Sequence, residues 1–391
     1  EFGSISAGLH FTMVLCLYDG LLTLVELNHA ALMPDLTTST EDRTKLNNAS
    51  AAGAILGSLS SFFGHMYWSQ DAQGGGVGPF RRFSTVVALL ATIGFAFSAE
   101  KVCTDADRHR ESKLVAEGGE ASERKKPPLS MATVVRQMMK HKNFGLFTLV
   151  SALQVFECTF EKNFLSIFVD LLMQDVSKHT RSLIISTSFV LPWIVTILLA
   201  PAVSRFGVRS VIIASFCLKV LLGVIALAVG LKRPLFIGAF AVMTRVFTEC
   251  VCRLGPLVLS DLVDEDKVLH SRARTMSAMF IGTNSFFTKP GESLAPMLGW
   301  AIVNSGGGQV GGEGLGKGVE STLFYCLVGG PLVVASVQLV FWNMYSLHGS
   351  YLQRIKDLVN NMDVEGGVGD SEIADVVDWP QQKGHHEEKM Q

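Results

Sequence analysis

The longest apolar runs of the chain are the feature that most restricts its fold. Three examples are SLIISTSFVLPWIVTILLAPAV (182–203), SVIIASFCLKVLLGVIALAVG (210–230) and STLFYCLVGGPLVVASVQLVFW (321–342). Each exceeds the roughly 18 apolar residues that indicate a membrane-spanning helix. In lipid every backbone N–H and C=O group needs a partner within the chain, and a helix supplies one. The runs lack the alternation of barrel strands, so the sequence predicts an all-α polytopic membrane protein.

The composition agrees with this prediction and argues against several functional classes. Hydrophobic residues make up 48% of the 391 positions and charged residues 17%, whereas soluble proteins carry about 25% charged residues. The formal net charge of −2 leaves no basic surface for nucleic acid. The sequence contains no P-loop, no nucleophile elbow and no His/Cys cluster with metal-ligand spacing. We therefore expect neither an enzyme nor a metal site nor a bound cofactor.

The order of apolar and polar segments predicts nine membrane spans. They cover roughly residues 7–33, 48–69, 82–100, 143–173, 182–204, 209–230, 234–260, 275–303 and 320–346. Residues 101–142 read as a polar, basic linker loop, residues 304–319 as a glycine-rich linker, and residues 347–391 as a disordered tail. Six spans after a long central loop are typical of the major facilitator fold. We expect a partial N-terminal bundle of three helices (1–100), a C-terminal six-helix bundle (143–346), and three further helices ahead of this chain.

Basic residues in the loops predict the orientation. Loops 34–47, 101–142, 205–209 and 261–274 and the tail hold about 21 Lys and Arg, and the opposite loops hold about 7. The more basic side faces the cytoplasm. The charged stretch DLVDEDKVLHSRAR (261–274) would then be a short cytoplasmic connection between two spans. We expect a monomer in the plasma membrane, with the lipid bilayer as its surroundings.

Three motifs carry a resemblance to a known family. NHAALMPDLTTSTEDRTKLN (28–47), DLVDEDKVLHSR (261–272) and FTKPGESLAPMLGW (287–300) resemble signatures of the glycoside–pentoside–hexuronide:cation symporters. Asn28 and His29 stand where that family has a proline and an aromatic residue. The resemblance implies the major facilitator fold, with about nine of twelve helices in this chain. It also implies symport of a small solute such as a sugar, coupled to Na⁺ or H⁺.

The resemblance also suggests where a coupling cation binds. Glu26 matches an acidic position of the family's cation site, and Asp19 lies two turns before it on the same helix face. Lys289 matches a lysine that reaches the acidic cluster in relatives, so it is expected to pair with Glu26. Tyr18 and His29 are candidates for the cavity wall. Structural roles for these residues remain open alternatives.

Further ionisable residues lie in predicted spans, where each needs a partner or water. Arg245, Glu249 and Arg253 form an i, i+4, i+8 ladder that can neutralise itself. This spacing favours a structural role over substrate binding.

A second group of polar residues lies in the span 143–173. Gln154 and Glu157 are cavity candidates. Glu161 lies one turn after Glu157 on the same face, and Lys162 is expected to neutralise one of the two carboxylates. The family signature does not include them, so a structural role is the favoured interpretation.

The charged stretch that follows the span 234–260 is the candidate cytoplasmic gate. By analogy with the family, its side chains pair with the first half of the transporter, where Arg43 is the expected partner. The alternative is a solvated hairpin without a gating role, whose charges only reflect the excess of charged residues in cytoplasmic loops. The candidate residues are Arg43, Asp261, Asp264, Glu265, Asp266 and Arg272.

Two functional hypotheses therefore follow from the sequence. The first is a secondary transporter that works by alternating access. The second is a membrane protein that keeps the scaffold without transporting, and a carrier of lysolipid-like cargo is a third alternative.

The orientation is directly testable. An epitope tag inserted in loop 101–142 or at the C-terminus should stay unstained on intact cells and become visible after permeabilisation. A tag in loop 304–319, on the opposite side, is the matched control and should stain on intact cells. Surface staining of either of the first two tags contradicts the orientation.

Overall fold

The computed structural model describes residues 2–67, 78–101, 131–272, 275–305 and 317–365, and these ranges are helical with short connections. The three helices of the first part are α1 (Phe2–Leu36), α2 (Thr40–Tyr67) and α3 (Gly78–Lys101). The second part contains α5 (Met131–Lys140), α6 (Lys142–Leu172), α7 (Lys178–Leu198), α8 (Ala200–Phe206), α9 (Val208–Val229), the 3₁₀ turn η1 (Gly230–Lys232), α10 (Pro234–Leu269), α11 (Ser277–Ser305), α12 (Lys317–Asn343) and α13 (Gly349–Glu365).

The predicted all-α membrane fold is confirmed. Seven of the described helices are long and apolar enough to cross a bilayer: α1, α3, α6, α7, α9, α10 and α12. The other two predicted spans, α2 and α11, are helices of 28 and 29 residues. At 1.5 Å per residue both are long enough to span the hydrocarbon core. They are less apolar because α2 opens with charged residues and α11 carries Lys289 and Glu292.

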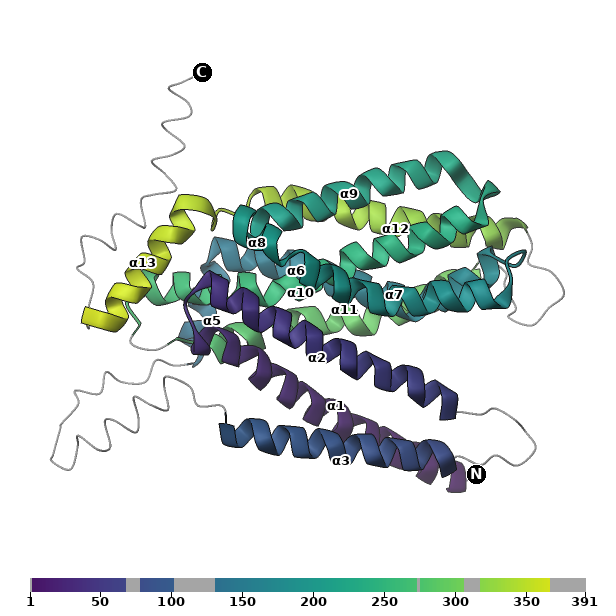
Figure 1. Ribbon diagram of the computed structural model, residues 1–391, viewed down its shortest axis with the longest axis horizontal. Coiled ribbons are helices and arrows are strands. Elements are labelled where there is room, and N and C mark those ends of the chain that lie inside the picture. The colour runs from purple at the N-terminus through teal and green to yellow at the C-terminus, as the bar shows by residue number, and fades with distance from the viewer. Residues whose placement is uncertain (1, 68–77, 102–130, 273–274, 306–316, 366–391) are drawn as a thin grey trace, which may run out of the picture.

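The helices fall into two groups that meet at one end (Figure 1). In the first group, α1 lies against α10 and α11, α2 lies against α7, α8 and α10, and α3 contacts α2. The second group comprises α5 to α13. The turn between α1 and α2, the C-terminal part of α10, α5 and α13 gather at the same end of the molecule (Figure 1). We call this end the junction end.

Three predicted loops at the junction end are largely helical, and these are corrections. Only residues 37–39 separate α1 from α2, where a loop over 34–47 was expected. Residues 261–269 continue α10, so most of the charged stretch is not a connection. Residues 349–365 form α13, where a disordered tail was expected. The helices persist because their charged and apolar side chains are buried against one another, a tertiary effect that the linear pattern does not contain.

Two further boundaries differ from the expectation. The predicted span 182–204 is divided at Leu199 into α7 and α8, and Pro201 lies in the first turn of α8. Proline suits a first turn because its missing N–H has no helical partner there. The last part of the predicted loop 101–142 forms α5. Residues 102–130 and 366–391, which complete the predicted loop and tail, lie outside the described residues.

Large aromatic residues fill the interior of the second group. Phe144 of α6 packs edge-on against Phe280 of α11, with ring centroids 5.1 Å apart. Trp342 at the end of α12 stacks on Tyr345 at 4.6 Å. These residues belong to the core nearest the junction end, which therefore rests on α6, α11 and the end of α12.

A glycine allows α11 to approach α6 closely. A Cβ atom added at Gly299 would lie 2.1 Å from ring atoms of Phe164 on α6. That ring is fully buried and also packs against Trp300, with centroids 5.9 Å apart. The ring has no free space to move into, so a residue with a side chain at this position forces the two helices apart.

Gly299→Ala should lower the thermal midpoint of the purified protein, at a cost of about 1–3 kcal/mol for an overpacked core. Gly282→Ala on the same helix is the matched control, because a Cβ there has no atom within 4 Å. The control should be neutral or slightly stabilising, since alanine is the better helix former. Equal midpoints for the two variants would show that α6 and α11 do not pack in this way.

Candidate functional site

A buried ion-pair network joins the two helix groups at the junction end. We call Arg43, Asp261, Asp264 and Lys356 the junction cluster. Arg43 of α2 donates two hydrogen bonds to Asp264 of α10, of 2.6 and 3.0 Å, and one of 3.4 Å to Asp261. Its Nε donates to the carbonyl oxygen of Thr37 at 2.7 Å. The side chains of Arg43 and Asp264 are 1% and 0% exposed, so this pair is withdrawn from water.

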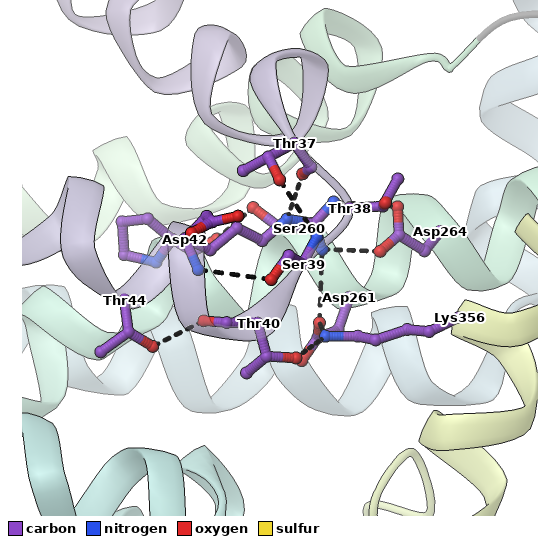
Figure 2. Close-up of polar contacts among 12 residues, drawn as sticks. Thr37, Thr38, Ser39, Thr40, Asp42, Thr44, Ser260, Asp261, Asp264 and Lys356 are labelled. Carbon is purple, nitrogen blue, oxygen red and sulfur yellow. Dashed lines mark hydrogen bonds and ion pairs between the residues drawn. The ribbon is translucent and has the colours of Figure 1, made fainter. Parts of the chain in front are cut away.

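Helix α13 completes the junction cluster from the second group. The Nζ atom of Lys356 lies 2.9 Å from Asp261 Oδ1 and also contacts the hydroxyl of Thr40 at the start of α2. Figure 2 shows Lys356 reaching from its helix toward Asp261 and Thr40. The Thr38 hydroxyl donates to the side-chain oxygen of Asn360 at 2.9 Å. The cluster thus contains two cations and two carboxylates and is neutral as a whole.

The next acid of α10, Glu265, is bound within the second group. It accepts hydrogen bonds from the Tyr351 hydroxyl at 3.0 Å and the Asn143 amide at 2.9 Å. His141 Nε2 lies 3.5 Å from the same carboxylate. Burial lowers the pKa of His141 to about 4, so the ring is neutral, and its Nδ1 accepts the Phe144 N–H at the start of α6. Burial also raises the pKa of Tyr351, whose hydroxyl therefore stays a donor.

Asp266 and Arg272 form a local pair and do not reach the first group. Arg272 Nε lies 2.6 Å from Asp266, and its Nη2 donates to Gln137 of α5 at 3.0 Å. His270 Nδ1 lies 2.9 Å from the same carboxylate. Of the six candidate gate residues, Arg43, Asp261 and Asp264 meet across the two groups. Glu265, Asp266 and Arg272 organise the end of α10, and their membership of the gate stays untested.

A second contact across the groups was not expected from the sequence. Asp35, at the end of α1, accepts hydrogen bonds from the hydroxyls of Thr275 at 2.8 Å and Ser277 at 2.5 Å. Ser277 is the first residue of α11. Asp35 therefore ties the start of α11 to the end of α1.

The cation candidates on α1 lie apart from the junction end. Asp19, Glu26, Tyr18 and His29 are exposed in the described structure. Lys289 is paired with Glu292 on its own helix, 3.0 Å apart. The expected ion pair between Glu26 and Lys289 is not present among the described residues. Glu292 is nearer because it lies one turn along the same helix.

The polar residues of α6 are buried inside the second group. Lys219 of α9 pairs with Glu157 at 2.6 Å, and both side chains are almost fully buried. The expected partner, Lys162, is exposed, because position 162 faces away from the interior. Gln154 donates to the carbonyl oxygen of Thr248 at 2.7 Å, so it is held by α10.

The expected ladder on α10 is present. Arg245 Nη2 lies 2.7 Å from Glu249 Oε1, and Arg253 Nη2 lies 3.6 Å from Glu249 Oε2. Aromatic rings of α7 cover both guanidinium groups, Phe189 at 5.0 Å from Arg245 and Trp193 at 3.9 Å from Arg253. Such contacts favour a positively charged group. They support the structural interpretation of the ladder.

Comparison with known proteins agrees with this architecture. A family model described as MFS/sugar transport protein matches residues 3–349. The chain belongs to this family. It is 33% identical to mouse transmembrane protein 180 over 392 residues, covering 91% of this chain and 74% of the relative. It is 32% identical to chicken transmembrane protein 180 over 375 residues, covering 89% and 73%. The family assignment and the nearly continuous match are consistent with a transporter-like membrane protein.

The sequence analysis missed two lysines that matter for these sites. Lys219 interrupts an otherwise apolar run, and a lone charge inside a span needs a partner, so this signal was available. Lys356 lies in a segment that was expected to be disordered. Its neighbours Tyr351, Ile355 and Val359 are buried, and their spacing of four residues marks one face of a helix.

The junction cluster makes a prediction about stability. Arg43→Met leaves Asp264 buried without a cation, which typically costs about 3–5 kcal/mol, so the thermal midpoint should fall strongly. Lys45→Met on the same helix is the matched control. Lys45 is exposed and pairs only with the exposed side chains of Glu41 and Asp42, so its loss should leave the midpoint unchanged. Equal effects of the two substitutions would contradict the buried pair.

Proposed function

We propose that the chain is a secondary transporter that carries a small polar solute such as a sugar, coupled to H⁺ or Na⁺, by alternating access. The family assignment supports the transporter class, and the family is described as one of sugar transport proteins. The observation that carries the proposal is the junction cluster. In this proposal the junction end faces the cytoplasm in the plasma membrane, as the distribution of basic loop residues favours.

A buried ion pair is suited to a contact that opens and closes. Replacing such a pair by apolar residues is often neutral or stabilising, so stability alone gives little reason for Arg43 and Asp264. An apolar contact, however, exposes hydrophobic surface to water each time it opens. Charged side chains are solvated when they separate, which offsets the loss of their mutual attraction. The cluster therefore fits a gate between two bodies that part and rejoin.

The carboxylates of α1 are the proposed coupling residues. Asp19 and Glu26 lie seven residues apart, about 10 Å along one face of the helix, and α1 packs against α11, the helix that carries Lys289. A cation or proton bound by Glu26 changes the charge that α1 presents to α11. This change would bias the relative position of the two helix groups, which is what coupling requires.

The proposal is tested by transport into liposomes that contain the purified protein. Labelled hexoses, pentoses and hexuronides are offered with an inward Na⁺ or H⁺ gradient. At least one sugar should accumulate, and Glu26→Gln should abolish accumulation while leaving exchange of labelled for unlabelled sugar intact. Glu41→Gln, an exposed carboxylate on α2, is the matched control and should accumulate sugar normally.

The opposite outcome is equally clear. If neither gradient drives accumulation of any sugar by folded protein, the symporter proposal is wrong for sugars. A parallel assay with a labelled lysolipid then separates a lipid carrier from a scaffold that does not transport.

A further inference from the structure

In the interior of the second helix group, two buried carboxylates of α6 lie beside one lysine that forms an ion pair with only one of them. Glu157 and Glu161 lie one turn apart on α6, and both are more than nine-tenths buried. Lys219 forms its ion pair with Glu157 at 2.6 Å. Two ionised carboxylates at this spacing repel each other, and one ammonium group balances only one of them. Glu161 therefore needs a separate account.

Among the described residues, no cation of the neighbouring helices forms an ion pair with Glu161, although Arg245 keeps two donors, Nε and Nη1, without a partner. On α9 the facing group is Lys219, already paired, and on α10 it is Arg245, which bonds Glu249 at 2.7 Å. On α12, Cys326 lines a small pocket together with Glu161. The pocket is otherwise formed largely by apolar side chains of α6, α10 and α12. The α11 pair, Lys289 with Glu292, is half-exposed and self-contained.

One oxygen of Glu161 has no partner at all. The Oε2 atom is buried without a hydrogen bond in the described structure. An ionised carboxylate with such an oxygen and no cation bound to it is strongly unfavourable in apolar surroundings. Glu157 Oε1 is also unpaired, but that carboxylate has the ammonium group of Lys219 at 2.6 Å, which Glu161 lacks. The carbonyl oxygen of a neutral carboxylic acid is far less costly to leave unpaired.

The contact of the other carboxyl oxygen, Glu161 Oε1, indicates which atom carries the proton. Glu161 Oε1 lies 3.2 Å from Thr248 Oγ1, and this hydroxyl lies 3.0 Å from the carbonyl oxygen of Thr244. The Thr248 hydroxyl has one proton, and the carbonyl can only accept. A hydroxyl bound to the carbonyl four residues earlier is the common arrangement in helices. With that proton committed, the contact between Glu161 and Thr248 is a hydrogen bond only if the carboxyl group supplies the proton.

From the burial, the unpaired oxygen and this proton count, we infer that Glu161 is a proton-binding site inside the second helix group. The proton resides on Oε1 and is donated to Thr248 Oγ1, while Oε2 is the carbonyl oxygen that faces the apolar interior. The site is separate from the coupling residues proposed on α1. It stands whether or not the protein transports, because it is defined by the folded second group alone.

The first experiment is infrared spectroscopy of the full-length protein near neutral pH. A protonated carboxyl group has a carbonyl stretching band that ionised carboxylates lack, and exposed acids are ionised at this pH. The wild type should show this band, and Glu161→Gln should remove part of its intensity. Burial raises the pKa of Glu265 to about 7, so Glu265 can contribute the part that remains. Glu292→Gln removes a half-exposed carboxylate and is the matched control, which should keep the band. A wild-type spectrum without the band overturns the inference.

Thermal stability gives an independent readout. Glutamine resembles a protonated glutamic acid, so Glu161→Gln should keep the wild-type midpoint near neutral pH. Glu157→Gln, the same change one turn away, leaves Lys219 unpaired and should lower the midpoint by many degrees. The folded wild type holds a proton that the unfolded chain releases, so raising the pH from about 6 to about 9 should lower its midpoint more than that of Glu161→Gln.

The alternative outcomes are distinct. If Glu161→Gln is as unstable as Glu157→Gln, or does not fold, Glu161 is an ionised member of the Lys219 ion pair and the inference is wrong. If the wild type and Glu161→Gln respond equally to pH, no proton is bound at Glu161. None of these measurements requires a substrate, so their failure is separate from failure of the proposed transport.

Discussion

The ion pair between Arg43 and Asp264 sets the relation between the two helix groups. A fully buried guanidinium must have its charge and its donors satisfied, because an uncompensated buried charge is far more costly than a broken surface pair. Asp264 supplies two oxygens, Asp261 a third, and the Thr37 carbonyl a fourth acceptor. These acceptors come from α10 and from the turn before α2. The position of that turn against α10 is therefore fixed by the needs of one side chain.

Much of the fold is visible in the sequence because lipid restricts the choices. A long apolar run in a membrane has to be a helix. The number and order of the long helices therefore follow from the number and order of the apolar runs in the sequence. The pairing of Arg43 with the acidic stretch was expected from the analogy with the symporter family, with a solvated hairpin as the alternative. What the sequence could not show was the extent of α10. Seven Asp, Glu, Lys and Arg residues in fourteen positions indicate a solvated segment unless their partners are known, and the partners Lys356 and Arg43 are distant in the chain.

The same limitation explains the errors around α6. Lys162 was chosen as the partner of a buried glutamate because it is adjacent in sequence. On a helix, however, adjacent residues point in directions about 100° apart, so Lys162 and Glu161 cannot both face the interior. Lys219 faces it from another helix, a relation that only tertiary packing creates. Glu292 was likewise missed as the partner of Lys289, although a spacing of three residues places both on one helix face.

The charges around Glu157 and Glu161 balance within the second helix group, whereas those of the junction cluster balance only between the two groups. This difference affects what happens when the two groups move apart. Within the second group, Lys219 neutralises Glu157, and a proton on Glu161 leaves this set of three side chains neutral without help from α1–α3. In the junction cluster the second group contributes Asp261, Asp264 and Lys356, with a net charge of −1, and the first group contributes Arg43, with +1. Separation of the groups leaves the interior of the second group unchanged. Separation breaks the ion pairs of Arg43 with Asp261 and Asp264 at the junction end, where water can solvate the separated charges. A rigid-body motion of the two groups would therefore concentrate its electrostatic cost on Arg43, and the interior charges would hold the second group together while it moves.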